Sequence, residues 1–126
     1  MNLQDLSMKS LATGCLALAA WTAAAGATTP AELLAGYNTQ AGASGQPARG
    51  QKLFTTTQGR DMSCASCHGA LPTQAAKHAS TGKPIAALAP AFNPERFTDP
   101  AKVEKWFRRN CNDVMARECT PTEKAD

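Results

Sequence analysis

The stretch that most constrains this chain is Cys64-Ala65-Ser66-Cys67-His68. Cys-X-X-Cys-His is typical of c-type haem attachment, because two thiols in one short turn can add to the two vinyl groups on one edge of a porphyrin. The adjacent imidazole then meets the iron from one face. The motif therefore predicts one covalent haem c, held by thioethers from Cys64 and Cys67, with His68 as the proximal axial ligand.

Two other interpretations of this motif are weaker. A thioredoxin-like redox pair is expected in a βαβ context, and the sequence shows no such pattern. A zinc site would need a second pair of ligands, and Cys111 and Cys119 are farther apart than the roughly two to four intervening residues that zinc sites use. A histidine that directly follows the second cysteine also fits haem better.

Length and charge limit the class of protein. With 126 residues the chain forms one small domain. A domain of this size buries a small fraction of its surface and is marginally stable, so a large apolar cofactor would complete its core. The net charge is +3, from 13 Lys and Arg against 10 Asp and Glu, with no basic block of the kind that binds nucleic acid. This mild excess of positive charge favours encounter with an acidic protein partner.

The N-terminus predicts export. Lys9 precedes an apolar run from Leu11 to Ala25, which is too short to span a bilayer convincingly, and Ala25-Gly26-Ala27 is a small-residue cleavage site. We therefore expect residues 1–27 to be a signal peptide, with Met8 as an alternative start to Met1, and residues 28–126 to form the monohaem domain. The expected location is a bacterial periplasm, with no stable membrane insertion after cleavage.

Four helix starts can be recognised from proline and capping residues. Each has proline at its first helical position, and three are preceded by a Thr or Asp that can cap the helix: Thr29-Pro30, Gln46-Pro47, Asp99-Pro100 and Thr120-Pro121. Leu33, Leu34 and Tyr37 give the first helix an apolar face, and Leu53 and Phe54 of the second are expected to be core. These signals predict four helices.

The segment from Gly69 to Asp99 is too rich in proline and glycine for long helices, and we expect it to be a loop that crosses the haem. Such a loop commonly supplies an axial methionine, yet no methionine lies between His68 and Val114. The loop does contain His78, but a lone loop histidine is more often hydrogen-bonded or solvated than a ligand.

The helix that begins at Pro100 carries apolar residues at spacings of three and four: Val103, Trp106, Phe107 and Val114. Asn110 falls within this stripe, where a buried amide needs a partner. Its amide could bond a loop carbonyl or bind the iron, and the pattern alone does not separate these alternatives or exclude Met115 as the ligand.

Outside the cytoplasm a disulfide is the default for two cysteines that haem does not use. Cys111 and Cys119 can be bridged only if the helix ends between them, because a continuous helix would hold their Cα atoms about 12 Å apart and bridged Cα atoms lie within about 7 Å. Two buried free thiols are the alternative.

Residues 93–99, 105–111, 117–120 and 123–126, taken with the haem motif, resemble the sphaeroides haem protein family of small periplasmic monohaem cytochromes. The resemblance covers most of the chain from about Tyr37. It implies an all-α, class I cytochrome c-like helical fold wrapped around one haem, Asn110 as the sixth ligand of ferric iron opposite His68, and a disulfide between Cys111 and Cys119.

The family resemblance also implies a function. Asn110 would leave on reduction, so that ferrous iron could bind oxygen or nitric oxide, and a dihaem or membrane cytochrome would be the redox partner. Members of the family continue into a C-terminal helix, whereas this sequence stops at Asp126, so we expect either that the sequence is a fragment or that the helix is lost.

A haem enzyme acting on peroxide, nitric oxide or oxygen is the alternative function. Peroxide chemistry needs a positioned acid–base group above the iron, and His78 is the only candidate in the loop, with no evident partner. We therefore favour an electron carrier that binds diatomic ligands over a haem enzyme. A ligand-responsive sensor would have to act through another protein.

Overall fold

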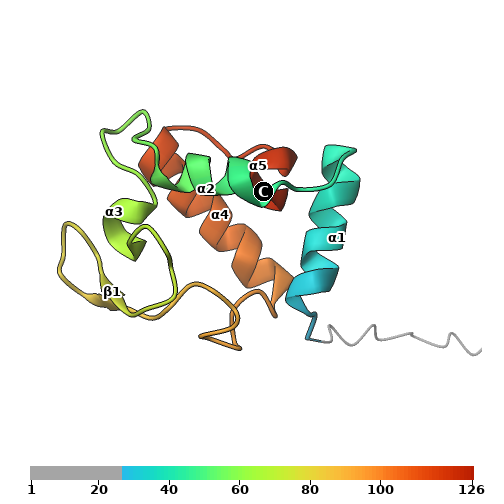
Figure 1. Cartoon of the computed structure of the whole chain (residues 1–126), viewed down its shortest axis with the longest axis horizontal. Coiled ribbons are helices and arrows are strands. Elements are labelled where there is room, and N and C mark those ends of the chain that lie inside the picture. The colour runs from blue at the N-terminus through green and yellow to red at the C-terminus, as the bar shows by residue number, and fades with distance from the viewer. Residues whose placement is uncertain (1–26) are drawn as a thin grey trace, which may run out of the picture.

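The computed structural model describes residues 27–126, so the predicted signal peptide lies almost wholly outside it. The regular secondary structure of these residues is helical apart from one two-stranded ladder (Figure 1). Its helices are α1 (Pro30–Ala41), α2 (Pro47–Thr55), α3 (Ala65–His68), α4 (Pro100–Met115) and α5 (Pro121–Ala125). The predicted all-α fold is confirmed.

The helices begin where proline and capping residues predict. Thr29 and Thr120 each form a capping box. The threonine hydroxyl accepts from the backbone N–H of the glutamate three residues later, and the carboxylate of that glutamate accepts from the backbone N–H of the threonine. Asp99 caps α4, because its carboxylate accepts from the backbone N–H of Lys102 at 3.0 Å. Gln46, before α2, makes no side-chain cap.

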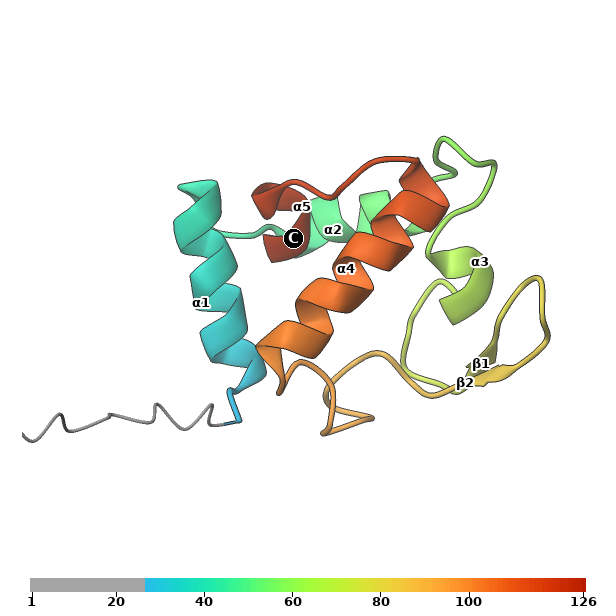
Figure 2. The ribbon, with the colours of Figure 1, turned by 180° about the vertical axis from the view of Figure 1, so that it is seen from behind.

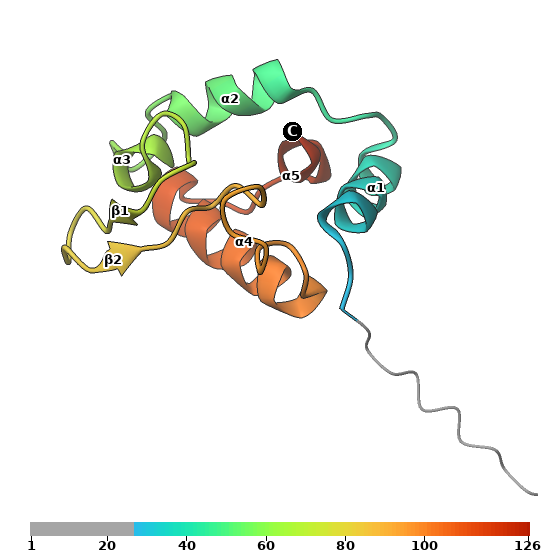
Figure 3. The same ribbon diagram turned by 60° about the horizontal axis from the view of Figure 1, so that its bottom comes forward.

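A small core joins α1, α4 and α5. Tyr37, Val103 and Ala125 are buried together, and Leu33, Phe97 and Phe107 pack against them. The Tyr37 hydroxyl donates to Glu104 at 2.7 Å, and the Lys124 ammonium donates to the other oxygen of that carboxylate at 2.8 Å. Figure 3 shows the result, with α5 lying between α1, α2 and α4.

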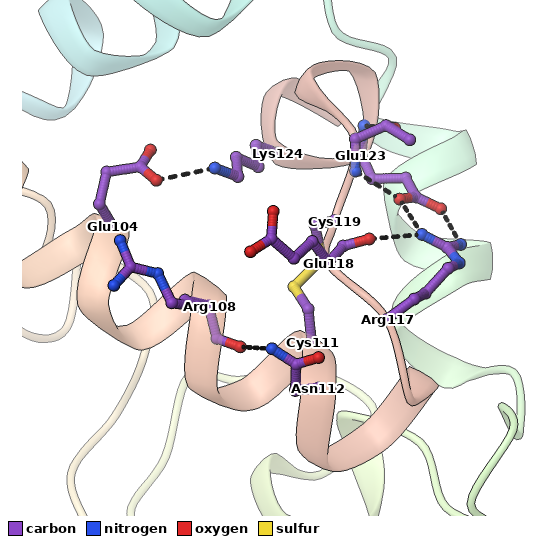
Figure 4. Close-up of a disulfide and its surroundings, with 10 residues drawn as sticks. Glu104, Arg108, Cys111, Asn112, Arg117, Glu118, Cys119, Glu123 and Lys124 are labelled. Atoms are coloured by element: carbon purple, nitrogen blue, oxygen red, sulfur yellow. Dashed lines mark hydrogen bonds and ion pairs between the residues drawn. A yellow bond between two sulfur atoms is a disulfide. The ribbon is translucent and has the colours of Figure 1, made fainter.

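The end of α4 is cross-linked to the segment that leads into α5. Cys111 and Cys119 form a disulfide with their Cα atoms 5.6 Å apart (Figure 4). The bridge is possible because α4 ends at Met115, and Ala116 then takes a left-handed conformation with φ of 58° that turns the chain back. The requirement that the helix end between the two cysteines is thus met.

The segment between α3 and α4 contains no helix, as its prolines predict, but it forms a ladder that the sequence pattern does not predict. Strands β1 (Ala76–Lys77) and β2 (Pro84–Ile85) are antiparallel, with Ala76 opposite Ile85 and Lys77 opposite Pro84. The turn between them uses Gly82 at a φ of 67°, a conformation that glycine adopts without strain. Strands this short leave no hydrophobic alternation to recognise.

Two side chains are more exposed than their helical patterns predict. Leu34 is 44% exposed, because Leu33 and Tyr37 are the residues of α1 that face the core. Asn110 is also exposed, so the prediction that it is buried in an apolar stripe is wrong. Because successive residues turn by about 100°, the core-facing side of α4 is centred on Val103, Phe107 and Cys111, and Asn110 lies at its edge beside the 39% exposed Trp106.

Candidate functional site

The haem-attachment motif lies on a single turn of chain. Cys64 precedes α3, and Cys67 and His68 are its last two residues, followed by Gly69 at a φ of 73°. Ser63 and Ser66 brace the turn, since each backbone N–H donates to the hydroxyl of the other serine, at 3.0 and 3.2 Å. The motif is therefore prearranged by local hydrogen bonds.

Both motif cysteines are free thiols, and both are half-buried. Burial raises the pKa of the Cys64 thiol, and the neighbouring Cys67 raises it further, so that Cys64 stays protonated. The Cys67 sulfur accepts a hydrogen bond from the backbone N–H of Ala79 at 3.3 Å, which ties the attachment turn to the β1–β2 hairpin.

The imidazole of His68 is held in its neutral form. Burial lowers the pKa of His68, and the charge of Arg96 lowers it further. The ring of Phe54 in α2 lies 6.2 Å from the imidazole, centroid to centroid. A neutral, half-buried imidazole is the form that binds iron, so the environment of His68 suits the predicted role.

Arg96 and the Ala79 N–H are parts of this site that the sequence did not single out. Arg96 is fixed by donating from Nε to the carbonyl oxygen of Ala87 at 3.3 Å, and Asn93 donates to the same oxygen at 3.0 Å. Both donors lie in the segment 93–99 that carries the family resemblance. That resemblance is the only signal in the sequence that marks Arg96.

Asn110 is on α4, and the structure places this helix next to the attachment turn. Figures 1, 2 and 3 all show α3 beside the C-terminal half of α4, which is the half that carries Asn110. The backbone N–H of Arg60 also donates to the Val114 carbonyl at 3.2 Å, which links the loop before α3 to the end of α4. The elements that carry His68 and Asn110 are therefore neighbours.

The other two ligand candidates are placed differently. The Nδ1 atom of His78 accepts from the backbone N–H groups of Ser80 and Thr81, both at 3.3 Å, so this exposed ring is engaged in the hairpin turn. Met115 is the last residue of α4 and lies about 140° around the helix from Asn110. Asn110 and Met115 therefore cannot face the same group.

The residues present fit a covalently bound haem. Cys111 and Cys119 are joined to each other, which leaves Cys64 and Cys67 as the free thiols of the described chain. Because Cys111 and Cys119 are joined in a disulfide, they cannot supply the second pair of thiolate ligands that a zinc site would need. The core is small, and Leu71 and Phe92 are more than 60% exposed, so a large apolar cofactor has surface to cover.

Known proteins share both the fold and the sequence. The structure of oxidised SHP, an oxygen-binding cytochrome c, matches with a TM-score of 0.73 and 53% identity over 80% of this chain and 93% of that one. The crystal structure of oxidised cytochrome c'' from Methylophilus methylotrophus matches with a TM-score of 0.68 and 36% identity, over 76% and 86% of the two chains.

Sequence comparison agrees. The cytochrome c-type protein SHP of Cereibacter sphaeroides is 53% identical over 114 residues, which cover 87% of this chain and 88% of the relative. Cytochrome c'' is 47% identical over 75 residues, which are 60% of this chain and 52% of that protein. A domain of unknown function, DUF1924, matches residues 40–126.

Fold and site together define a c-type cytochrome with covalently bound haem c. The chain belongs to the family of the cytochrome c-type protein SHP. The family resemblance inferred from the sequence is thus confirmed. The axial role of Asn110 is not tested by these comparisons and stays a prediction.

Proposed function

We propose that this protein is a periplasmic monohaem cytochrome that transfers electrons, with His68 and Asn110 as axial ligands, and that Asn110 is displaced on reduction so that oxygen or nitric oxide can bind. The similarity to SHP supports this proposal, since SHP is described as an oxygen-binding cytochrome c. Cytochrome c'' offers related support, since its solution structure addresses haem-ligand detachment.

One observation carries the proposal: the helix half that bears Asn110 lies beside the turn that bears Cys64, Cys67 and His68 (Figures 1 and 2). No methionine occurs in the loop where an axial methionine is common, and His78 is engaged in the hairpin turn. Asn110 is exposed and, among the described residues, its side-chain amide makes no hydrogen bond. It is therefore available as a ligand.

The chain's own groups support the proposal of a stable His68 ligand and a displaceable Asn110 ligand. When bound, the haem iron supplies one-electron redox chemistry and a coordination position for a small ligand. His68 is kept neutral by burial and by Arg96, and it follows directly on the Cys67 attachment point. The Asn110 amide oxygen is a neutral, weak donor that favours ferric over ferrous iron, so we expect it to be the ligand that dissociates.

Optical and electron paramagnetic resonance spectra of the haem-loaded protein test this assignment. Asn112 provides a matched control, because it is an exposed asparagine in the same helix whose amide donates to the Arg108 carbonyl at 2.8 Å. We expect a high-spin or mixed-spin ferric wild type. Asn110→Ala should lose any low-spin signal and shift the high-spin signal, and Asn112→Ala should leave both unchanged. Reduced wild type should bind carbon monoxide.

A purely low-spin ferric spectrum of the wild type would exclude Asn110 as the sixth ligand and would favour His78 or Met115. His78→Ala and Met115→Leu would then identify the ligand. Equal effects of Asn110→Ala and Asn112→Ala would also contradict the assignment, because they would indicate a general disturbance of α4.

Export and partners complete the proposed function. The predicted signal peptide, residues 1–27, lies almost entirely outside the described residues. Among the described residues the structure contains no helix with the length and hydrophobicity of a membrane span. We infer that a dihaem or membrane cytochrome exchanges electrons with this protein. Cell fractionation of the full-length chain checks its location, and haem-containing protein found only in the cytoplasm would contradict the proposal.

A further inference from the structure

One side of α4 carries a row of cations. Lys102, Lys105 and Arg109 are spaced by three and four residues, so they share one side of the helix, and all three are exposed. We call these three residues the α4 cationic stripe. Figure 2 shows α4 running across the front of the molecule with no other element drawn over it. The stripe thus lies on an accessible helix.

The stripe differs from the cations that hold α5 in place. Arg49, Arg117 and Lys124 form ion pairs with Asp126, Glu123 and Glu104, and Figure 4 shows the last two pairs. Among residues 27–126, Lys102 and Lys105 form no ion pair. Arg109 lies 3.7 Å from Asp113, and both side chains are more than 60% exposed. An ion pair this exposed adds little to the free energy of folding.

An aromatic ring borders the stripe. The Lys105 ammonium lies 5.9 Å from the centroid of the Trp106 ring, and the Arg109 guanidinium lies 5.5 Å from it. Such contacts hold two long side chains in place on a rigid helix. Arg109 directly precedes Asn110, and Trp106 lies about one turn before it, so the stripe borders the proposed sixth ligand.

We propose that the α4 cationic stripe is the docking surface for an acidic electron-transfer protein. This inference rests on the proposed function, because it names the surface through which the haem exchanges electrons. Three cations in line attract a complementary acidic patch and accelerate encounter. A lipid surface is disfavoured, because interfacial helices insert several apolar side chains and this side of α4 offers one ring that is 39% exposed.

Stopped-flow reduction of the haem-loaded protein tests the proposal. The donor is reduced flavodoxin, an acidic one-electron protein, and photoreduced lumiflavin is the small uncharged comparison. The variant is Lys102→Glu with Lys105→Glu, and the control is Lys77→Glu with Lys83→Glu on the β1–β2 hairpin, which makes the same change in net charge at two exposed lysines. At low salt the α4 pair should slow reduction by flavodoxin about tenfold, and high salt should remove the difference.

Each other outcome overturns the inference in its own way. Equal slowing by the hairpin pair would show that only net charge matters, and no slowing by the α4 pair would show that the stripe is merely solvated. Binding to phosphatidylglycerol vesicles that the α4 pair abolishes, with flavodoxin rates unchanged, would assign the stripe to membranes. If lumiflavin fails to reduce the wild type, the proposed electron transfer itself fails; if lumiflavin succeeds, only the docking surface is in question.

Discussion

The two sides of the proposed iron site are supported in different ways. The attachment turn is held by local hydrogen bonds, from Ser63 and Ser66 within the turn and from the Ala79 N–H to the Cys67 sulfur. The α4–α5 region is held by a disulfide, by ion pairs and by a capping box. The proposed ligand His68 directly follows an attachment cysteine and needs little further support, whereas the proposed displaceable ligand, Asn110, needs a rigid helix in order to return to the iron.

Removing the covalent attachment should give the largest effect. We expect Cys64→Ala with Cys67→Ala to lose all covalently bound haem, because no other free cysteine remains among the described residues. Haem staining after denaturing electrophoresis measures this loss. Cys15→Ala is the control and should retain its haem, since Cys15 lies in the predicted signal peptide. Covalent haem in the double variant would contradict the assignment of the attachment turn.

Removing the disulfide should destabilise the α4–α5 region. We expect Cys111→Ala with Cys119→Ala to lower the free energy of unfolding by about 2.5 kcal/mol, because the bridge restricts a short loop of the unfolded chain. Urea denaturation measures the change. A dithiol reductant should destabilise the wild type to a similar extent and leave the variant unaffected. If the variant is as stable as the wild type, the rigid support inferred for Asn110 does not come from the disulfide.

The contact between α2 and the end of α5 can be tested at a glycine. A Cβ atom at Gly50 would collide with the backbone carbonyl of Asp126, so Gly50→Ala should lower the free energy of unfolding by about 1 to 2 kcal/mol. At Gly36 in α1 nothing lies within 4 Å of the added atom, and Gly36→Ala should raise it by about 0.5 to 1 kcal/mol. Thermal unfolding of both variants measures the difference. Equal effects would mean that the α2–α5 contact adds no stability.

The smallest effect is expected at the ion pair beside the disulfide. Arg117 lowers the pKa of Glu123 to about 2, from a value near 4.5 in the unfolded chain. The ionised carboxylate therefore stabilises the folded protein at pH values above 4.5, and this contribution is lost as the pH falls toward 2. Because Arg117 is half exposed, solvent screening reduces the stabilisation to about 1 kcal/mol. Glu123→Gln retains a capping side chain and removes the charge.

Urea midpoints of the wild type and Glu123→Gln should therefore differ at pH 7 and converge between pH 4.5 and 2. Arg109→Gln is the matched control, because it removes the cation of an exposed pair at 3.7 Å and should change the midpoint little at either pH. A difference for Glu123→Gln that persists at pH 2 would show that the charge is not its source.

The sequence predicts local structure here better than it predicts contacts between distant residues. Proline and its capping neighbours mark the starts of α1, α4 and α5, because capping depends on residues three positions apart. The attachment motif is equally local. The bond from Tyr37 to Glu104 spans 67 residues, and no pattern in either helix indicates its partner. The exposure of Asn110 does not follow from the sequence either, because the orientation of α4 depends on where α1 and α5 pack.

The disulfide has a consequence for biosynthesis. Cys111 could form a disulfide with Cys64, Cys67 or Cys119, and only the bridge to Cys119 leaves both attachment thiols free. Cys111 is 5% exposed and bridges to a cysteine only eight residues away, so this pair can close locally while Cys64 and Cys67 stay reduced. A chain that forms the Cys111–Cys119 disulfide first therefore keeps Cys64 and Cys67 available for haem attachment.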